Sequence, residues 1–304
     1  MIRGYVPLLL IVAGIWGASY LFIKVAVDEI EPTAMMELRL ILAALVLVPF
    51  VVLRLGRSRA LAELRATGSG AWVLGAANMA IPFTLIAWGE KHVDSGIAAI
   101  ANASVPIFVL VLAIRYRPSE RVTGIRLAGV LLGLAGVGVL TGLHPEGGWW
   151  AVAGTLAVVV ASFSYAVANL YTQHRFPETS PLVITAASAV AAAILLLPFA
   201  LVQLPDEVPS WQALGSVAAL GLAGTAIALI FFYRMLVQYG AARASLVTYL
   251  LPPFALVYGV LFLSEEITLN AALGLFLILA GVALGSGVVR LARRRTPAPA
   301  APPP

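Results

Sequence analysis

The chain has 304 residues, of which 61% are hydrophobic and only 11% are charged, and its mean hydropathy is +0.99. A soluble domain of this length needs far more polar surface, so the composition excludes a soluble globular protein. The absence of cysteine excludes a disulfide framework and a thiol nucleophile, and the net charge of +5 fits the basic side of a membrane protein better than a nucleic-acid-binding surface.

Ten apolar runs follow one another along the chain, each long enough to cross the hydrocarbon core of a bilayer as a helix. They cover residues 6–27, 33–53, 70–89, 94–114, 123–142, 149–172, 181–203, 211–236, 241–263 and 269–290. The first run lacks a small-residue cleavage site followed by a soluble chain, so we expect a retained helix. The chain ends in TPAPAAPPP, and we expect a disordered tail over 291–304. The sequence thus predicts an all-α membrane protein with ten transmembrane helices.

The basic residues predict how these spans are oriented. Of the 19 Lys and Arg residues, all but Lys24, Arg39 and Lys91 fall on the side that holds the N-terminus. The gaps on the other side are acidic and include Asp28 and Glu265. Because basic residues favour the cytoplasmic side, we expect a bacterial inner-membrane protein with both termini in the cytoplasm.

The fifth and tenth runs begin with the same polar pattern, which indicates an internal repeat. The segments 119–142 and 264–287 align at an offset of 145, and they share a Ser-Glu pair, a following Thr and several glycines. A chance match between two glycine-rich helices is the alternative. Five spans per copy is an odd number, so the second copy enters the membrane from the opposite side. We expect an inverted 5+5 repeat, with residues 1–143 as the first unit and 144–290 as the second.

An inverted repeat favours transport, because exchanging the conformations of its two halves opens a central site to either side of the membrane. The alternative is a scaffold for a membrane enzyme or assembly factor. The three histidines, His92, His144 and His174, lie at span ends or in gaps, where they form no catalytic or metal-binding group at depth. We therefore expect no catalytic residues, no metal and no cofactor, with a small-molecule substrate and the lipid bilayer as partners and no nucleic acid.

Polar and aromatic residues on apolar spans are costly in lipid, so we expect them to face the interior and bind substrate. They recur at helical spacings of three and four on spans from both halves. Hydrogen bonding between helices is the alternative use of such residues. The candidates are Trp16, Tyr20, Asn78, Pro82, Asn102, Ser162, Tyr165, Asn169, Ser245, Thr248 and Tyr249.

Charged residues and prolines on the spans suggest moving parts. Lys24, Glu37 and Arg39 fall near the outer ends of the first two spans, where they could form a gating ion pair or offer a cation to a substrate carboxylate; snorkelling to the surface is the alternative for Lys24. Pro106 and Pro252 occupy matching places in the two halves and are candidate hinges, or fixed kinks needed for packing. The absence of a carboxylate clearly at mid-bilayer argues against ion coupling, with Glu37 and Glu90 as the remaining candidates.

The fifth and tenth spans carry glycine repeats and almost no polar side chain. Such helices suit close packing, so we expect them to act as scaffold helices outside the cavity or as the contact in a homodimer; monomer and homodimer both stay open.

With these features the chain resembles the EamA-type members of the drug/metabolite transporter superfamily. The segment WGASYLFIK from Trp16 to Lys24, followed by Pro32 and Arg39, is similar to that family's opening motif. The pairs Glu120–Thr123 and Glu265–Thr268, each before a glycine-rich span, are similar to its half-closing motif. The resemblance implies a ten-helix inverted-repeat exporter or facilitator of small metabolites, often amino acids; within it, the aromatic residues expected in the cavity favour the aromatic amino acid exporters of the YddG type.

The expected function is therefore export of a neutral or zwitterionic metabolite, most simply an amino acid with aromatic ones favoured, by alternating access without obvious ion coupling. A drug exporter is the alternative within transport, and a membrane-embedded scaffold or enzyme is the alternative of another class.

Overall fold

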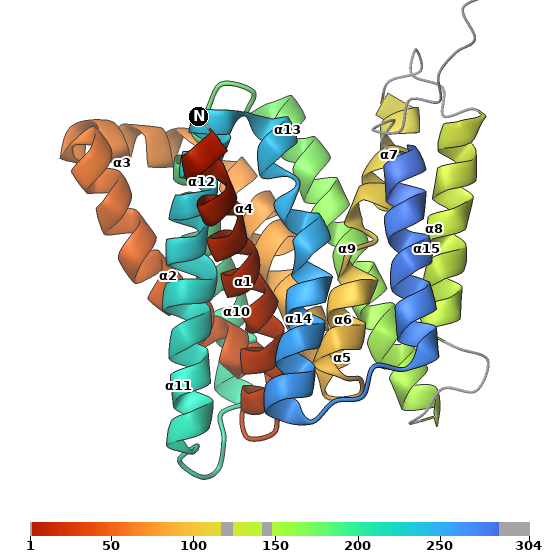
Figure 1. Ribbon diagram of the computed structural model, residues 1–304. Coiled ribbons are helices and arrows are strands. Elements are labelled where there is room, and N and C mark those ends of the chain that lie inside the picture. Colours follow the sequence, from red (N-terminus) through yellow and green to blue (C-terminus); the bar gives the residue numbers. More distant parts are fainter. Residues whose placement is uncertain (1, 117–123, 142–147, 286–304) are drawn as a thin grey trace, which may run out of the picture.

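A computed structural model describes residues 2–116, 124–141 and 148–285, and every regular element in these ranges is a helix (Figure 1). The first copy of the repeat motif at 119–123, which includes Glu120, and the expected tail at 291–304 lie outside the described residues. The first half contains α1 (Ile2–Val27), α2 (Pro32–Leu55), α3 (Arg57–Ala66), α4 (Ser69–Gly75), η1 (Ala76–Ala80), α5 (Ile81–Glu90), α6 (Ser95–Asn102), α7 (Val105–Tyr116) and α8 (Ile125–Thr141). The second half contains α9 (Gly148–Arg175), α10 (Pro181–Val202), α11 (Trp211–Ala219), η2 (Leu220–Ile227), α12 (Ala228–Tyr239), α13 (Ala241–Ala244), α14 (Val247–Leu263) and α15 (Leu269–Gly285).

Seven helical stretches of the described chain are long and apolar enough to cross a membrane, and three shorter apolar helices accompany them. The seven are Gly4–Val27, Pro32–Leu55, Ser69–Glu90, Ser95–Leu112, Gly148–Arg175, Pro181–Val202 and Trp211–Tyr239; the shorter ones are Leu127–Leu140, Val247–Leu263 and Leu269–Leu284. Each predicted run overlaps one of these stretches, which confirms the all-helical membrane class. The sequence reading did not identify α3, a polar helix in which Arg59 and Glu63 form an ion pair of 2.7 Å.

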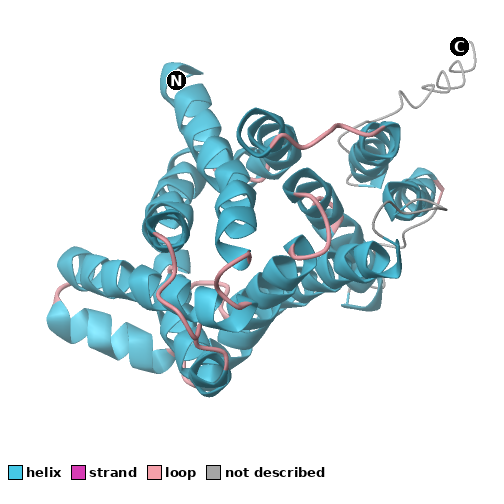
Figure 2. Ribbon diagram, turned by 90° about the horizontal axis from the view of Figure 1, so that it is seen from below, coloured by secondary structure: helices cyan, strands magenta, loops and turns pink. Residues whose placement is uncertain are grey.

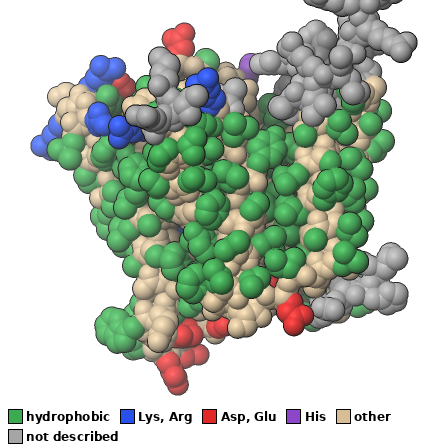
Figure 3. Space-filling model, in the orientation of Figure 1, with side chains coloured by type: hydrophobic (Ala, Val, Ile, Leu, Met, Phe, Trp, Pro, Cys, Tyr) green, Lys and Arg blue, Asp and Glu red, His purple; other side chains and the backbone are tan. Residues whose placement is uncertain are grey.

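The lateral surface of the bundle is apolar, as a lipid-facing surface must be. Large side chains such as Leu45, Val160 and Phe276 are more than half exposed, and Figure 3 shows hydrophobic side chains covering the flank between the two ends. Soluble proteins rarely expose apolar surface on this scale. In the same view most Lys and Arg lie at one end and most Asp and Glu at the other. We name these the basic end (Arg54, Arg57, Arg59, Arg65, Arg175 and Arg243) and the acidic end (Asp28, Glu29, Glu31, Asp206, Glu207, Glu265 and Glu266).

The helices α8 and α15, which correspond to the fifth and tenth predicted spans, pack against each other at one side of the bundle (Figure 1). A Cβ atom at Gly281 would lie 2.5 Å from the backbone nitrogen of Gly133, and one at Gly274 would lie 3.1 Å from the carbonyl oxygen of Gly136. Glycine therefore lets the two backbones touch, which is the usual role of small residues in membrane helices. Because these glycine faces are occupied within the chain, a dimer through α8 and α15 would use their outer faces.

The remaining helices pack in two matching sets. α1 lies against α14 and against the stretch from α11 to α12, while α9 lies against α6 and α7 and against the stretch from α4 to α5. Exchanging the two predicted repeat units converts one set of contacts into the other. The contact between α2 and α10 pairs equivalent spans of the two units. Figure 1 shows α1 and α9 running in opposite directions, and Figure 2 shows the bundle along its helices.

Two spans contain a π-helical segment, and these segments occupy equivalent positions. η1 covers Ala76–Ala80, and the offset that pairs Ser119 with Ser264 places it on residues 221–225, inside η2. The backbone N–H of Ile81 reaches the carbonyl of Ala76, five residues back, directly before Pro82. Proline has no backbone N–H and cannot continue the α-helical ladder, so a wider turn accommodates it. π-helical turns are frequent at functional sites.

The fourth and ninth predicted spans each contain proline, and in each of them a short break interrupts the helix. The chain leaves the helix between Asn102 and Val105, immediately before the candidate hinge Pro106. In the second half the break lies between Ala244 and Val247, whereas α14 runs through the other candidate hinge, Pro252, and through Pro253. The two breaks are thus near, but not at, equivalent positions, and the hinge role of the two prolines stays a prediction.

Candidate functional site

Three candidate residues from three different helices meet in a buried hydrogen-bond network. The amide nitrogen of Asn102 in α6 donates to the hydroxyl of Tyr20 in α1 at 2.8 Å. The hydroxyl of Ser162 in α9 donates to the side-chain oxygen of Asn102 at 3.1 Å. Tyr20 is 5% exposed and Ser162 is fully buried. The network therefore joins both halves of the chain and serves the interhelical role that the sequence left open beside substrate binding.

Arg39 is buried next to this network without an acidic partner. Its Nε donates to the hydroxyl of Thr225 in η2 at 2.9 Å, and its Nη1 contacts the sulfur of Met36 at 3.8 Å. The guanidinium carbon lies 3.9 Å from the centre of the Phe83 ring, a cation–π distance. Arg39 is only 6% exposed. Among the described residues no carboxylate forms a salt bridge with Arg39, so a buried positive charge remains available to an anionic group.

Lys24 uses its ammonium to terminate α5. Its Nζ donates to the backbone carbonyl of Glu90 at 2.7 Å, an orphan acceptor at the C-terminus of α5, and to that of Val93 in the following turn at 2.9 Å. Glu37 is buried, and its Oε2 has no hydrogen-bond partner among the described residues. Within those residues no ion pair joins Lys24, Glu37 and Arg39, so the ion-pair form of the predicted gate is absent from this conformation.

Four further candidates lie between the network and the basic end. Trp16 is half-buried, donates from its Nε1 to the carbonyl of Gly224 at 3.1 Å and packs on Phe232. Asn78 and Tyr165 are likewise half-buried, whereas Pro82 is buried at the start of α5. Tyr165 and Tyr20 both lie near Arg39, and Trp16 contacts η2 directly before Thr225, the hydrogen-bond partner of Arg39.

The last four candidates lie towards the basic end and are more exposed. Asn169 is exposed and accepts a hydrogen bond from Gln173 at 3.1 Å on its own helix. Ser245 and Thr248 are exposed around the break before α14, and Tyr249 is half-buried. The helix ends at this point are tied by the hydroxyl of Tyr5, which donates to the carbonyl of Arg243 at 2.8 Å. Candidate residues are thus more buried towards the acidic end and more exposed towards the basic end.

Two carboxylates at the acidic end cap helices of the other half. Glu265 accepts hydrogen bonds from the backbone nitrogens of Ser95 at 2.8 Å and Gly96 at 3.2 Å and from the Ser95 hydroxyl at 2.9 Å. A carboxylate at a helix N-terminus satisfies orphan donors and complements the helix dipole. The cap joins the repeat motif after α14 to the start of α6.

A similar cap joins the turn after α1 to the start of α11. Glu29 accepts from the hydroxyl of Ser210 at 2.5 Å and from its backbone nitrogen at 2.6 Å. These two bonds, the side-chain bond first, lower the pKa of the Glu29 carboxyl from its ordinary value. The Ser210 hydroxyl in turn accepts from the backbone nitrogen of Ala213.

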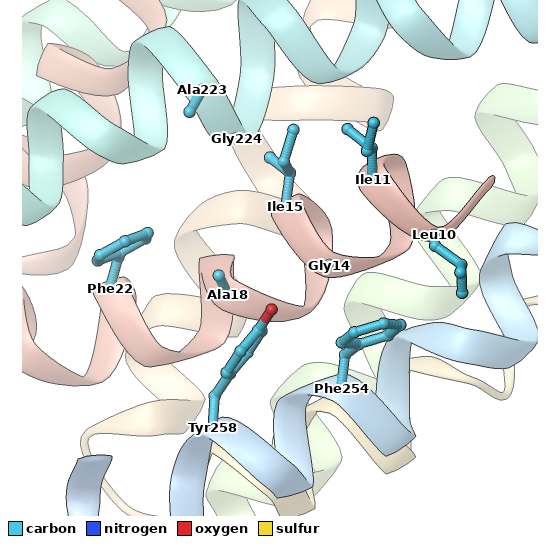
Figure 4. A pocket seen from close by; sticks show the side chains of 10 residues that line it. All are labelled: Leu10, Ile11, Gly14, Ile15, Ala18, Phe22, Ala223, Gly224, Phe254 and Tyr258. Atoms are coloured by element: carbon cyan, nitrogen blue, oxygen red, sulfur yellow. The ribbon is translucent and has the colours of Figure 1, made fainter. Parts of the chain in front are cut away.

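A separate groove of about 530 Å³ runs along the flank between α1, η2 and α14. Figure 4 shows that apolar side chains line it, among them Leu10, Phe22 and Phe254. None of the eleven predicted substrate residues lines this groove. Its open, apolar walls fit contact with lipid chains better than selection of a polar metabolite.

Sequence reasoning missed several residues of the central region. Phe83 and Thr225 both contact Arg39, and each lies more than 40 residues away from it in the chain. Thr225 was detectable as a polar residue on an apolar span, the signal that identified Ser162. Phe83 carries no such signal, because an aromatic residue is equally common on a lipid-facing surface.

Comparison with known proteins identifies a family that matches this chain. The profile of the EamA-like transporter family matches residues 4–142 and again residues 152–287. The uncharacterized transporter YoaV of Bacillus subtilis (strain 168) is 27% identical over 88% of this chain and 91% of its own length. The uncharacterized inner membrane transporter YedA of Escherichia coli (strain K12) is 26% identical over 81% and 78%. A probable terminal-alkyne amino-acid exporter of Streptantibioticus cattleyicolor is 29% identical over 73% and 72%.

A crystal structure shares the fold, with a TM-score of 0.64 and 20% sequence identity over 94% of this chain and 97% of the other. The family profile covers most of the chain in two consecutive matches. The resemblance expected from the opening and half-closing motifs is thereby confirmed: this chain belongs to the EamA-like transporter family, in the drug/metabolite transporter superfamily.

Proposed function

We propose that this membrane transporter exports amino acids, aromatic ones favoured, by alternating access between its two halves. The observation that carries the proposal is Arg39, a buried cation without an acidic partner among the described residues. A buried charge that forms no salt bridge is costly, so such a residue marks a place where an anionic ligand group gains most. The α-carboxylate of an amino acid supplies that group, and the guanidinium can bind it in two places at once.

Aromatic groups around Arg39 support an aromatic substrate. Phe83 stacks under the guanidinium, and Tyr20, Tyr165 and Trp16 lie in the same central region. Aromatic rings offer large, rigid contact area to another ring and interact favourably at offset or edge-on geometries. One relative is a probable terminal-alkyne amino-acid exporter, which is consistent with an amino acid as cargo for this chain.

The ten spans form an inverted 5+5 repeat in this proposal. Three observations support it: two consecutive family matches, contact sets that exchange with the repeat units, and π-helical segments at equivalent positions. The first unit is residues 1–143 and the second is residues 144–290. In such an architecture the substrate binds between the units near the middle of the membrane.

The proposed orientation places the basic end, both termini included, in the cytoplasm of a bacterial inner membrane. The two carboxylate caps then close the outer side, while Asn169, Ser245 and Thr248 are exposed towards the cytoplasm. The conformation is accordingly inward-facing. Amino acids enter from the cytoplasm, and opening of the acidic end releases them outside.

Flux into and out of proteoliposomes tests this function. Labelled amino acids, aromatic ones included, should cross only when the protein is present, and Trp16→Ala or Tyr165→Ala should reduce the rate several-fold. Trp211→Ala is the matched control, because Trp211 is 86% exposed at the start of α11 and touches none of the central residues described above. Flux of lipophilic cations without amino acid flux would instead establish the drug exporter, and no flux of either class would favour a scaffold or enzyme.

A further inference from the structure

The carboxyl group of Glu90 is buried without any hydrogen-bond partner. Glu90 is the last residue of α5, its side chain is 0% exposed, and neither Oε1 nor Oε2 meets a donor among the described residues. An ionised carboxylate in such a place lacks both water and a donor, so burial strongly disfavours the ionised form. Membrane proteins retain such groups where they function.

The charged neighbours of Glu90 come from three elements and are committed elsewhere. Lys24 of α1 lies nearby, but its ammonium binds the backbone carbonyls of Glu90 and Val93. Arg39 of α2 acts on Glu90 electrostatically, yet its hydrogen bonds go to Thr225 and Met36.

The other titratable neighbours do not compensate for the buried carboxyl. Glu265, which caps α6, is a like charge, and the hydroxyl of Tyr20, which accepts a hydrogen bond from Asn102, does not hydrogen-bond either carboxylate oxygen of Glu90. Tyr165 of α9 faces Arg39. His92, two residues after Glu90, stacks on Trp150 at 5.2 Å. None of these described groups forms a hydrogen bond with either carboxylate oxygen of Glu90.

We propose that Glu90 is a proton-binding site whose occupancy is linked to closure of the acidic end. Closure removes the carboxylate from water without giving it a donor, so a proton from water at the acidic end binds a carboxylate oxygen and forms a neutral carboxyl group. Opening rehydrates the group, and the O–H bond breaks to return the proton to water. The inference rests on the proposed alternating access and revises the expectation of transport without an ion.

The sign of the linkage follows from which state binds the proton. The closed state holds the proton and the open state releases it, so acid on that side favours closure and alkali favours opening. A single linked proton changes the closed-to-open ratio by at most about tenfold per pH unit. Glutamine at this position is neutral at every pH, so Glu90→Gln should hold the closed state and lose the pH response.

Cysteine labelling measures the opening directly and without a substrate. The chain has no cysteine, so one introduced at Ala98, fully buried in α6, is a unique reporter for a membrane-impermeant maleimide applied at the acidic end. The labelling rate of the cysteine at position 98 is divided by the labelling rate of a cysteine introduced at Val208, which is 90% exposed. This division removes the pH dependence of the thiol reaction itself. In the parent protein this ratio of labelling rates should increase with pH, by up to about tenfold per pH unit. In Glu90→Gln the ratio should be low and independent of pH.

Two control variants and one ion control decide the assignment. Glu37→Gln replaces the other buried carboxyl of this end, and His92→Gln removes the nearby imidazole; both should keep the pH response. A flat ratio in either variant, an unchanged response in Glu90→Gln, or a ratio that follows sodium instead of pH would overturn the proposal. Because labelling needs no cargo, these results are independent of whether amino acids prove to be the substrate.

Discussion

At the scale of single residues, the central question is how a buried arginine is tolerated. Arg39 gains one hydrogen bond from Thr225, a weak contact from Met36 and a cation–π contact from Phe83. None of these neutralises its charge. A substrate carboxylate would, which is why we assign the residue to binding and not to packing.

Replacing Arg39 tests that assignment. Arg39→Gln removes the charge, and the loss of a charge-assisted contact of about 2 kcal/mol lowers flux at limiting amino acid concentration by about thirtyfold. Arg39→Lys keeps the positive charge but loses the planar guanidinium, which can bind a carboxylate in two places. Its flux should therefore lie between that of the parent and that of Arg39→Gln. Initial rates in proteoliposomes over a substrate range give these values, with Arg59→Gln on α3 as the control. A substrate dependence unchanged in Arg39→Gln would contradict the binding role.

The cap at Glu29 has a pH dependence of known sign. Its hydrogen bonds to Ser210 lower the pKa of the folded carboxyl, so the cap contributes stability above the ordinary carboxyl range. That contribution is lost as the pH falls through the lowered folded pKa. The difference in melting temperature between the parent and Glu29→Gln in detergent should therefore shrink in acid. Glu207→Gln, an exposed acid of the same end, is the control, and a difference that grows in acid would refute the cap.

Single-residue features were partly visible in the sequence. Polarity on an apolar span identified Tyr20, Asn102 and Ser162, which the structure joins in one network. The partners of Lys24 could not be predicted, because they are backbone carbonyls, which every residue has whatever its side chain. The unpartnered state of Glu90 was also hidden, since it depends on where neighbouring side chains point.

At the scale of helices, close approach of α8 and α15 depends on glycine. A Cβ atom at Gly281 would lie 2.5 Å from the nitrogen of Gly133 and 2.6 Å from the oxygen of Gly129, both backbone atoms that cannot rotate away. The helices would have to separate to admit it. Forced shifts of this kind typically cost about 1–3 kcal/mol.

Gly281→Ala should therefore lower stability by about 1–3 kcal/mol, seen as a lower midpoint on thermal or denaturant unfolding in detergent. Gly138→Ala is a matched control on α8, because a Cβ atom there meets nothing within 4 Å. That variant should be neutral or slightly stabilising, since alanine restricts the unfolded chain. Equal stability of the two variants would show that the helices do not depend on this contact.

Glycine spacing was enough to predict close packing, but it did not identify the partner. The two helices could have packed against a second copy of the chain, and the structure instead pairs them with each other. The π-helical segments were also beyond the sequence. Pro82 explains the first, whereas η2 has no proline, and only the structure shows that it matches η1.

At the scale of the whole molecule, the membrane class and the run boundaries were predictable, because hydrocarbon demands long apolar helices with internally satisfied backbones. The matching contact sets of α1 and α9 follow from the repeat that the motifs suggested. The conformational state was not predictable. In the proposed alternating-access cycle it depends on which end has its caps formed, because the proposed inverted repeat would have two such states of similar energy.

The orientation of the whole molecule can be tested with the same cysteine-free background. A cysteine at Val208, 90% exposed at the acidic end, should react with an impermeant maleimide added to intact cells. A cysteine at Arg59, on the exposed face of α3 at the basic end, should react only after the membrane is permeabilised. The positive-inside distribution predicts this result, because moving the arginines of α3 across the membrane is unfavourable. The reverse pattern would place the open side of this conformation outside the cell, and the proposed direction of export would then have to be reversed with it.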